Sequence, residues 1–337
     1  MRPAPIGEAG AATAAGTTGL AVRAGLEVVA QYGFRVTDTR GDSDWFHVFE
    51  VPRAHGALTA DYDTVRARIV VEAVRSASEG ALIGVAGDSL VLRLREAYAG
   101  WRPWPWLSGS FGVVPTLTVP ELDATFRMRA VAQTPLEATG LASPADLGAT
   151  VRAELPRRYG WVGVGGYNGE GYNGRELNRG KNLEAAAEVH PLPLGAARPL
   201  AVFASYVAGS AGTGRARADR LTGALLWQDD WLRAGVAATY AWGVEDAGGV
   251  RSVLGDVFVH TEPYPRLLLG VRGSLWLRDT DADDDQVIQV TGAVGYRVAV
   301  PLEVFLATTR SLPAELAQDA LPGSDFWDFR LVSRVVF

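Results

Sequence analysis

Apolar and polar residues alternate at every second position along most of the chain after residue 19. From Leu20 to Tyr32 the even-numbered positions are apolar or aromatic, whereas Arg23, Glu27 and Gln31 occupy the other face. Side chains repeat every two residues on the faces of a β-strand and every 3.6 residues on a helix. The pattern therefore predicts an all-β protein.

The alternating runs have the length and composition of membrane-spanning strands. Most last roughly the 9–11 residues that a tilted strand needs to cross a bilayer, against five or six in a soluble sandwich. Their apolar face mixes leucine and valine with many alanines and glycines, and their polar face is rich in arginine. An apolar outer face and a polar inner face are typical of a transmembrane antiparallel β-barrel, which is the fold class that we predict.

We expect about 16 strands, an even number as single-chain bacterial barrels require. The expected strands are residues 20–34, 64–74, 80–86, 90–101, 106–114, 146–155, 159–168, 182–191, 199–208, 219–228, 231–243, 251–262, 265–278, 286–299, 301–310 and 326–337. If the first strand runs outward, the even-numbered connections are compact turns. The odd-numbered connections include the long segments 35–63, 115–145, 168–181 and 311–325. Short periplasmic turns and long outer loops are the arrangement of outer-membrane barrels.

Aromatic residues and the last run support a membrane location. Tryptophan and tyrosine gather at the ends of runs, among them Tyr98, Trp101, Trp104 and Trp161, and we interpret them as two interfacial girdles. The last run alternates to the end of the sequence and stops on Phe337. It resembles the C-terminal targeting strand of bacterial outer-membrane proteins.

Composition excludes several kinds of chemistry. The 337 residues contain no cysteine, which excludes thiolate metal sites, disulfides and a cysteine nucleophile. The formal net charge is -6, whereas nucleic-acid binders carry a basic footprint, so we expect no nucleic-acid partner. Lys181 is the only lysine, and all other cationic side chains apart from the histidines are arginines.

The chain is expected to form one domain. Residues 1–18 are mostly small and lack the apolar core of a secretory signal, so we expect a flexible leader over 1–18 and a single barrel domain over 19–337. Export would use a signal peptide that this sequence does not contain. Nowhere do 18 consecutive apolar residues occur, so no transmembrane helix is expected.

Six segments together resemble the phosphate-selective porin family of Gram-negative outer membranes, in the same order and at compatible spacing. They are VRARIVVEA (65–73), LREAYAGW (94–101), GSFGVVP (109–115), ASPADLGATV (142–151), YGWVGVGGYNGEGYN (159–173) and GKNLEAAAEVHPLP (180–193). The resemblance implies a 16-stranded, usually trimeric diffusion channel. Phosphate-specific members line the pore with arginine and lysine, and this chain has a single lysine, so an anion channel fits better than a phosphate-specific one.

In 16-stranded porins the third outer loop folds inward and narrows the channel, which gives residues 115–145 a candidate role. We interpret this loop as a constriction whose charged residues face arginines on the wall. The alternative is a surface loop that packs on a neighbouring protomer. The candidate constriction residues are Arg127, Arg129, Glu121, Asp123 and Glu137.

Arginines are expected to line the lumen. Reading inward faces by alternation selects, among others, Arg66, Arg68, Arg93, Arg95, Arg152, Arg233, Arg272 and Arg330. Guanidinium groups stay charged and are weakly hydrated, so they can line a pathway for anions. In the alternative interpretation these arginines pair with inward glutamates and keep the wall rigid.

The remaining motifs give weaker evidence of function. Asp279, Asp281 and Asp283 resemble the opening of a calcium loop, but Asp284 replaces its glycine and Val290 its distal glutamate. A solvated outer loop is therefore favoured over a divalent-ion bridge to lipopolysaccharide, and no metal site is expected. The four histidines show neither metal-ligand spacing nor an evident nucleophile nearby. We expect no enzymatic activity and no cofactor.

The sequence thus predicts an outer-membrane porin for passive diffusion of small hydrophilic solutes, with a mild anion preference. Expected partners are outer-membrane lipid and lipopolysaccharide, two further copies of the chain in a homotrimer, and small solutes, anions among them. The alternative is a structural barrel that sheathes or docks a partner protein.

Overall fold

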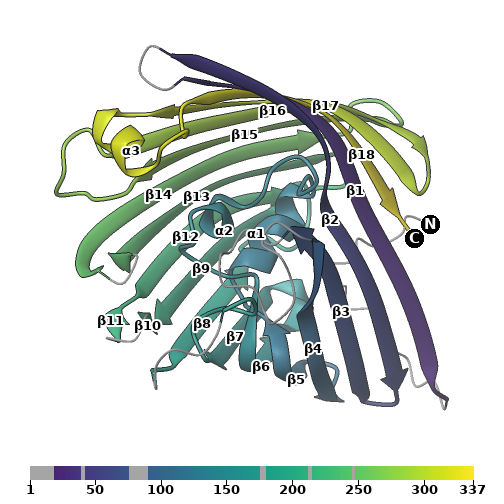
Figure 1. Cartoon of the computed structure of the whole chain (residues 1–337). Helices are drawn as coiled ribbons and strands as arrows, with labels where there is room; N and C mark the ends of the chain where they lie inside the picture. Colours follow the sequence, from purple (N-terminus) through teal and green to yellow (C-terminus); the bar gives the residue numbers. More distant parts are fainter. Residues whose placement is uncertain (1–18, 39–41, 76–89, 175–179, 212–214, 245–246) are drawn as a thin grey trace.

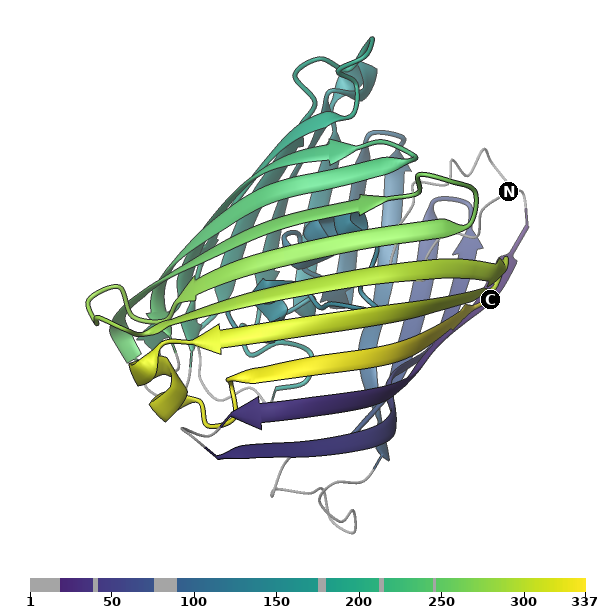
Figure 2. The same ribbon diagram turned by 90° about the horizontal axis from the view of Figure 1, so that it is seen from above.

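The computed structural model describes residues 19–38, 42–75, 90–174, 180–211, 215–244 and 247–337. Within these residues, sixteen antiparallel strands form one closed barrel, with β1 paired to β18 (Figure 1, Figure 2). This confirms the predicted fold class. The expected leader over 1–18 lies outside the described residues. Among the described helices, none is long and apolar enough to cross a membrane.

The barrel strands follow one another around the wall in chain order. They are β1 (Ala21–Asp38), β2 (Ser43–Tyr62), β3 (Val65–Arg75), β4 (Leu90–Trp104), β5 (Leu107–Pro115), β6 (Ala145–Glu154), β7 (Gly160–Tyr167), β8 (Asn182–Val189), β9 (Leu200–Ala208), β12 (Asp219–Gln228), β13 (Leu232–Val244), β14 (Ala247–Thr261), β15 (Leu267–Leu277), β16 (Gln286–Ala299), β17 (Leu302–Pro313) and β18 (Phe326–Val336).

Short elements occupy the connections. The two-residue strands β10 (Ser210–Ala211) and β11 (Ala216–Arg217) pair with each other between β9 and β12. The helices in the described part of the chain are α1 (Val119–Phe126), α2 (Pro135–Ala138) and α3 (Glu315–Ala320), with one 3-10 turn at Pro156–Arg158.

The number of barrel strands agrees with the prediction, but one strand differs. Residues 43–62 form β2, although the sequence pattern assigned 35–63 to an outer loop. The strand expected at 80–86 lies outside the described residues, and β3 pairs directly with β4. β2 escaped detection because a bulge at Pro52 reverses its alternation halfway along, so that no period-two run spans it.

The chain end closes the barrel. The backbone N–H of Phe337 donates to the carbonyl of Leu26 (2.9 Å), and the N–H of Leu26 donates to the carbonyl of Phe337 (3.2 Å). Phe337 is 68% exposed, so its ring remains on the surface at the end of the ladder. The closed ladder leaves no free edge among the described barrel strands, which is what a barrel in lipid requires.

The outer surface is apolar all around the described wall. Val164, Leu183, Leu225, Val236 and Leu306 come from five different strands and are each between 57% and 67% exposed. Large apolar patches of this kind are rare on soluble monomers and mark contact with lipid or with protein. The inward positions between them carry charged and small residues and also large apolar ones such as Phe203 and Phe258.

The predicted aromatic girdles need one correction. Trp101, Trp104 and Trp231 are more than half exposed near strand ends, as expected for interfacial rings. Trp161, by contrast, is buried inside the barrel, and Tyr98 pairs in register with Arg68 and shares its inward face. The face of a strand residue follows its position in the alternation and not its chemistry.

Residues 116–144, here called the inserted loop, connect β5 to β6 and lie inside the barrel with α1 and α2 (Figure 1). The apolar side of α1, formed by Val119, Leu122 and Phe126, is buried. It joins one apolar cluster with inward side chains of β9, β12, β14 and β15. The third outer loop therefore folds inward, as predicted, and covers one side of the lumen.

Candidate functional site

The start of the inserted loop is fixed to the wall by buried hydrogen bonds. Glu184 on β8 accepts the backbone N–H of Leu117 (2.9 Å) and the hydroxyl of Thr118 (2.6 Å). It also accepts the hydroxyl of Tyr167 on β7 (2.8 Å), and Thr118 contacts Ser205 on β9 (2.7 Å). Because a buried carboxylate is costly without partners, this set of donors holds the loop in one position.

An apolar contact fixes the middle of the inserted loop. The ring of Phe126 meets that of Phe258 on β14 edge-on, with centroids 5.4 Å apart. Met128 packs against the bare backbone of Gly270 on β15, where an added Cβ would lie 2.1 Å from its sulfur. Glycine at this position lets the loop approach the wall closely.

The first turn of α1 carries a carboxyl group against a second carboxyl group. Glu121 shares a hydrogen bond with Glu188 on β8 and lies 3.7 Å from Arg152 on β6. Gln228 also donates to Glu188 (2.9 Å). Burial, and then repulsion from Glu188, raise the pKa of Glu121 to about 8. The raised pKa favours a shared proton between the two carboxyl groups of Glu121 and Glu188.

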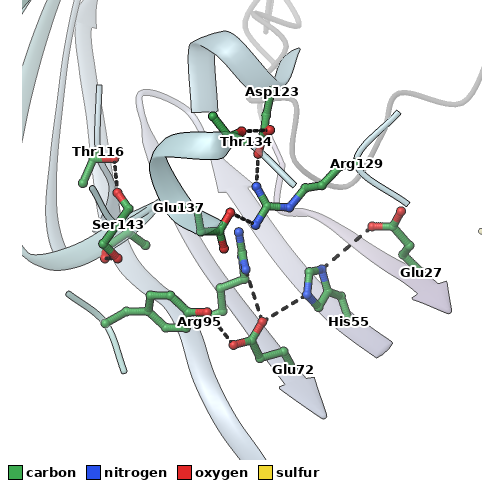
Figure 3. A network of polar contacts seen from close by, with 12 residues as sticks. Glu27, His55, Glu72, Arg95, Thr116, Asp123, Arg129, Thr134, Glu137 and Ser143 are labelled. Carbon is green, nitrogen blue, oxygen red and sulfur yellow. Dashed lines mark hydrogen bonds and ion pairs between the residues drawn. The ribbon is translucent and has the colours of Figure 1, made fainter. Parts of the chain in front are cut away.

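The charged residues after α1 are held together within the inserted loop. Arg129 binds the carboxylates of Asp123 and Glu137, and Thr134 donates its hydroxyl to Asp123 (Figure 3). Arg127 has φ 60 and ends α1 in the left-handed region, which turns the chain sharply. The five predicted constriction residues thus lie inside the barrel, where Glu121 faces the wall and Arg129 is paired within the loop.

The wall opposite this part of the loop carries Arg53 and His55 on β2. Trp45 and Phe49 face outward, and strict alternation would send Arg53 outward with them. The register between β1 and β2 shifts by one residue near Pro52, and this bulge turns Arg53 and His55 inward. Proline has no N–H to lose at such a position.

A second bulge adds charge at the same wall. The register between β3 and β4 shifts by one residue near Arg95, so that both Arg95 and Glu96 face inward. Strict alternation would have placed only one of these two side chains in the lumen.

Glu72 on β3 accepts hydrogen bonds from several side chains of this wall. It accepts the hydroxyl of Tyr172 (2.7 Å) and Nη1 of Arg95 (3.2 Å). His55 bridges two carboxylates, with Nε2 3.2 Å from Glu72 and Nδ1 3.8 Å from Glu27 (Figure 3). The wall facing the loop is therefore a connected ionic network and not a row of isolated charges.

Two cavities meet between the inserted loop and this wall. One has a volume of about 230 Å³ and the other of about 110 Å³, and Arg53 and Arg129 line both. Both cavities are thus bounded by one arginine from β2 and one from the loop.

The arginines predicted to line the lumen are mostly paired with acids. Their partners are Asp61 for Arg66 (2.6 Å), Glu96 for Arg68 (2.9 Å), Glu72 for Arg93 and Arg95, Glu154 for Arg152 (3.0 Å), the Ala124 carbonyl for Arg233 (3.4 Å), Asp256 for Arg272 (2.6 Å) and Asp328 for Arg330 (3.4 Å). This geometry favours the interpretation in which charge pairs make the wall rigid.

Arg53 and His55 are not among the predicted site residues, because the sequence pattern predicts a loop over residues 35–63. The available signal was Pro52 inside a stretch rich in β-branched and aromatic residues, since a proline within a strand often marks a bulge.

The aspartates after β15 do not gather around a common point. Asp279 accepts the backbone N–H of Asp281 (3.0 Å), and Asp285 pairs with Arg278 (2.8 Å). Among the described residues, no group of three or more histidines or carboxylates could hold a metal ion.

The fold resembles several solved structures. No protein-family model matches the sequence, and no curated protein matches it. OmpF of Salmonella typhi, in complex with daunomycin, aligns with a TM-score of 0.68 and 14% identity over 94% of this chain and 97% of that chain. The anion-selective porin of Comamonas acidovorans gives 0.66 and 11% over 95% and 100%. OmpT of Vibrio cholerae gives 0.63 and 14% over 95% and 99%. At these identities the likeness shows that the chain has the fold of 16-stranded outer-membrane porins.

Proposed function

We propose that this protein is an outer-membrane porin through which small hydrophilic solutes diffuse passively, with a mild preference for anions. The observation that carries the proposal is the inserted loop, which narrows a charged lumen inside a barrel with an apolar outer surface. A barrel of this kind gives polar solutes a path across lipid that needs no energy source.

The outer surface supports placement in a membrane. Its apolar side chains are exposed on every side of the described wall, with tryptophans near the strand ends. Lipid and lipopolysaccharide are the proposed contacts of this surface, and a homotrimer is the proposed assembly. Phe337, at the end of the closing strand, is the proposed end of the targeting signal for the outer membrane.

The balance of charges at the constriction supports the anion preference. Seven arginines line the two cavities, against three carboxylates. The arginines are Arg53, Arg95, Arg127, Arg129, Arg272, Arg330 and Arg334, and the carboxylates are Glu27, Glu96 and Asp123. Most of these arginines have acidic partners, so the net positive charge at the cavities is small. A small positive charge attracts anions without holding them tightly.

Liposome swelling tests the diffusion claim. The purified protein is reconstituted in phospholipid vesicles, which are then diluted into isotonic solutions of sugars or amino acids of increasing size. We expect fast swelling with the smallest solutes and a steep fall with size, because the inserted loop limits the passage. A folded barrel that permits no swelling would favour the alternative in which the lumen houses a partner protein.

A further inference from the structure

The larger of the two cavities, of about 230 Å³, has an unusual lining. Four arginines line it, Arg53, Arg129, Arg272 and Arg330, and no carboxylate does so among the described residues. They come from β2, the inserted loop, β15 and β18, so the fold brings together four charges that are far apart in the sequence.

We infer that this cavity binds a small organic monocarboxylate with an apolar body, such as an aromatic carboxylate. The inference rests on the proposed function, because it gives the channel a preferred class of solute.

Three of the four arginines have a buried nitrogen atom that makes no hydrogen bond within the described residues. These atoms are Nε of Arg129, Nη1 of Arg272 and Nε of Arg330. The side chain of Arg272 is only 3% exposed, and its other nitrogens bind both oxygens of Asp256. Buried donors without acceptors are costly, and a bound carboxylate would satisfy them.

The local charge fits a monoanion better than a polyanion. Arg129 is balanced by Asp123 and Glu137, and Arg272 by Asp256. Arg330 lies 3.4 Å from Asp328. These pairs leave little uncompensated positive charge. The cavity would therefore not offset the cost of desolvating a doubly charged phosphate, whereas a single carboxylate needs only a few hydrogen-bond donors.

The rest of the lining is apolar or neutral. Val29, Pro52, Val131 and Pro135 contribute apolar side chains, and Gln31 and Gln289 add amide groups. An inorganic anion would leave these apolar side chains in contact with water, whereas an aromatic or branched aliphatic body would cover them. The combination of guanidinium donors and apolar side chains in one lining selects for an amphipathic acid.

Isothermal titration of the refolded barrel in detergent tests binding independently of transport. The probes are benzoate, acetate, benzamide and inorganic phosphate, which separate the contributions of the carboxylate and of the ring. We expect benzoate to bind about tenfold more tightly than each of the other three. Equal affinity for benzoate and acetate, or tighter binding of phosphate, would overturn the inference.

Two variants locate the site. Arg53→Gln removes one lining charge, and Ala132→Phe fills the cavity with a ring. Each should weaken benzoate binding by roughly tenfold, whereas Arg23→Gln, a charge change on β1 outside the cavity, should leave it unchanged. Folding is checked by the slower migration of the heated protein on a gel. An equal effect of Arg23→Gln would place binding elsewhere.

Single-channel recording separates failure of the inference from failure of the proposed function. Benzoate added to an open channel should reduce the current through the wild type and not through Ala132→Phe. An open channel that benzoate neither binds nor blocks would refute the carboxylate site and leave the porin standing. Benzoate binding by a barrel without conductance would keep the site and refute the porin.

Discussion

Met128 occupies the space that a side chain at Gly270 would need. An added Cβ at Gly270 would lie 2.1 Å from the Met128 sulfur, so the inserted loop reaches the wall of the barrel only because β15 has a glycine there. The position of the inserted loop therefore depends on a residue of the wall that carries no side chain.

Gly270→Val is expected to displace the inserted loop and to destabilise the protein by about 1–3 kcal/mol, because Met128 has to move out of its site. Urea unfolding of the barrel in lipid vesicles measures the loss. Gly273→Val is the matched control, since a Cβ on Gly273 would meet Val257 at an ordinary 3.5 Å. An equal loss of unfolding free energy in both variants would show that the contact between Met128 and Gly270 has no special role. Adding Met128→Ala to Gly270→Val should restore part of the lost stability.

Glu72→Ala is expected to cost about 3 kcal/mol of unfolding free energy. Glu72 is buried and accepts hydrogen bonds from His55, Arg95 and Tyr172, and each of these residues would lose that contact. Glu154→Ala is the control, because Glu154 is partly exposed and pairs with Arg152 at 3.0 Å. The same urea titration compares the two, and a loss below about 1 kcal/mol for Glu72→Ala would contradict the account of the wall as a network.

Arg129→Ala is expected to reduce the anion preference of the channel, because Arg129 lines both cavities at the constriction. Arg127→Ala, at the end of α1, should act in the same direction. The readout is the reversal potential in a KCl gradient. Arg310→Gln removes the same charge from the outer face, where Arg310 pairs with Asp325 and stacks on Trp327. An equal shift of the reversal potential in Arg310→Gln would show that selectivity depends on the overall charge and not on the residues of the inserted loop.

The docking of α1 is expected to weaken as the pH rises. The pKa of Glu121 is raised to about 8 in the folded protein, above its ordinary value of 4.5. The proton on Glu121 therefore stabilises the folded state fully below pH 4.5, and this contribution is lost as the pH rises towards 8. In Glu121→Gln the contribution cannot titrate. The difference between the melting temperatures of wild type and variant should thus change between pH 4.5 and 8.

Asp319→Asn, on α3 in another loop, is the control for this titration and should follow the wild type across the same range. If the melting temperatures of Glu121→Gln and of the wild type changed in parallel with pH, the proton shared with Glu188 would not stabilise the loop.

The architecture could be predicted from the sequence because lipid and water impose opposite demands on the two faces of a strand. Runs such as residues 219–228 keep a strict alternation, with Leu221 and Leu225 exposed outside and Thr222 buried inside. Where a bulge interrupts the alternation, as at Pro52, the same reasoning assigned a strand to a loop and overlooked Arg53. One extra residue is enough to reverse every assignment that follows it in the strand.

The candidate site was harder to predict because its details depend on tertiary contacts. Arg127 and Arg129 could be located in the inserted loop from its length, but the pairing of Arg129 with Asp123 and Glu137 depends on how α1 and α2 fold back on each other. The cavity between Arg53, Arg272 and Arg330 joins strands that are far apart in the sequence, and no local pattern records this proximity.

The reversal potential of single channels in a planar bilayer, under a tenfold KCl gradient, is the sharpest test of the proposed porin. We expect discrete current steps and a reversal potential displaced modestly towards that of chloride, because arginines outnumber carboxylates in the lining of the two cavities. A displacement towards the potassium potential would contradict the assigned charge balance. A correctly folded barrel that carries no current would contradict the porin itself.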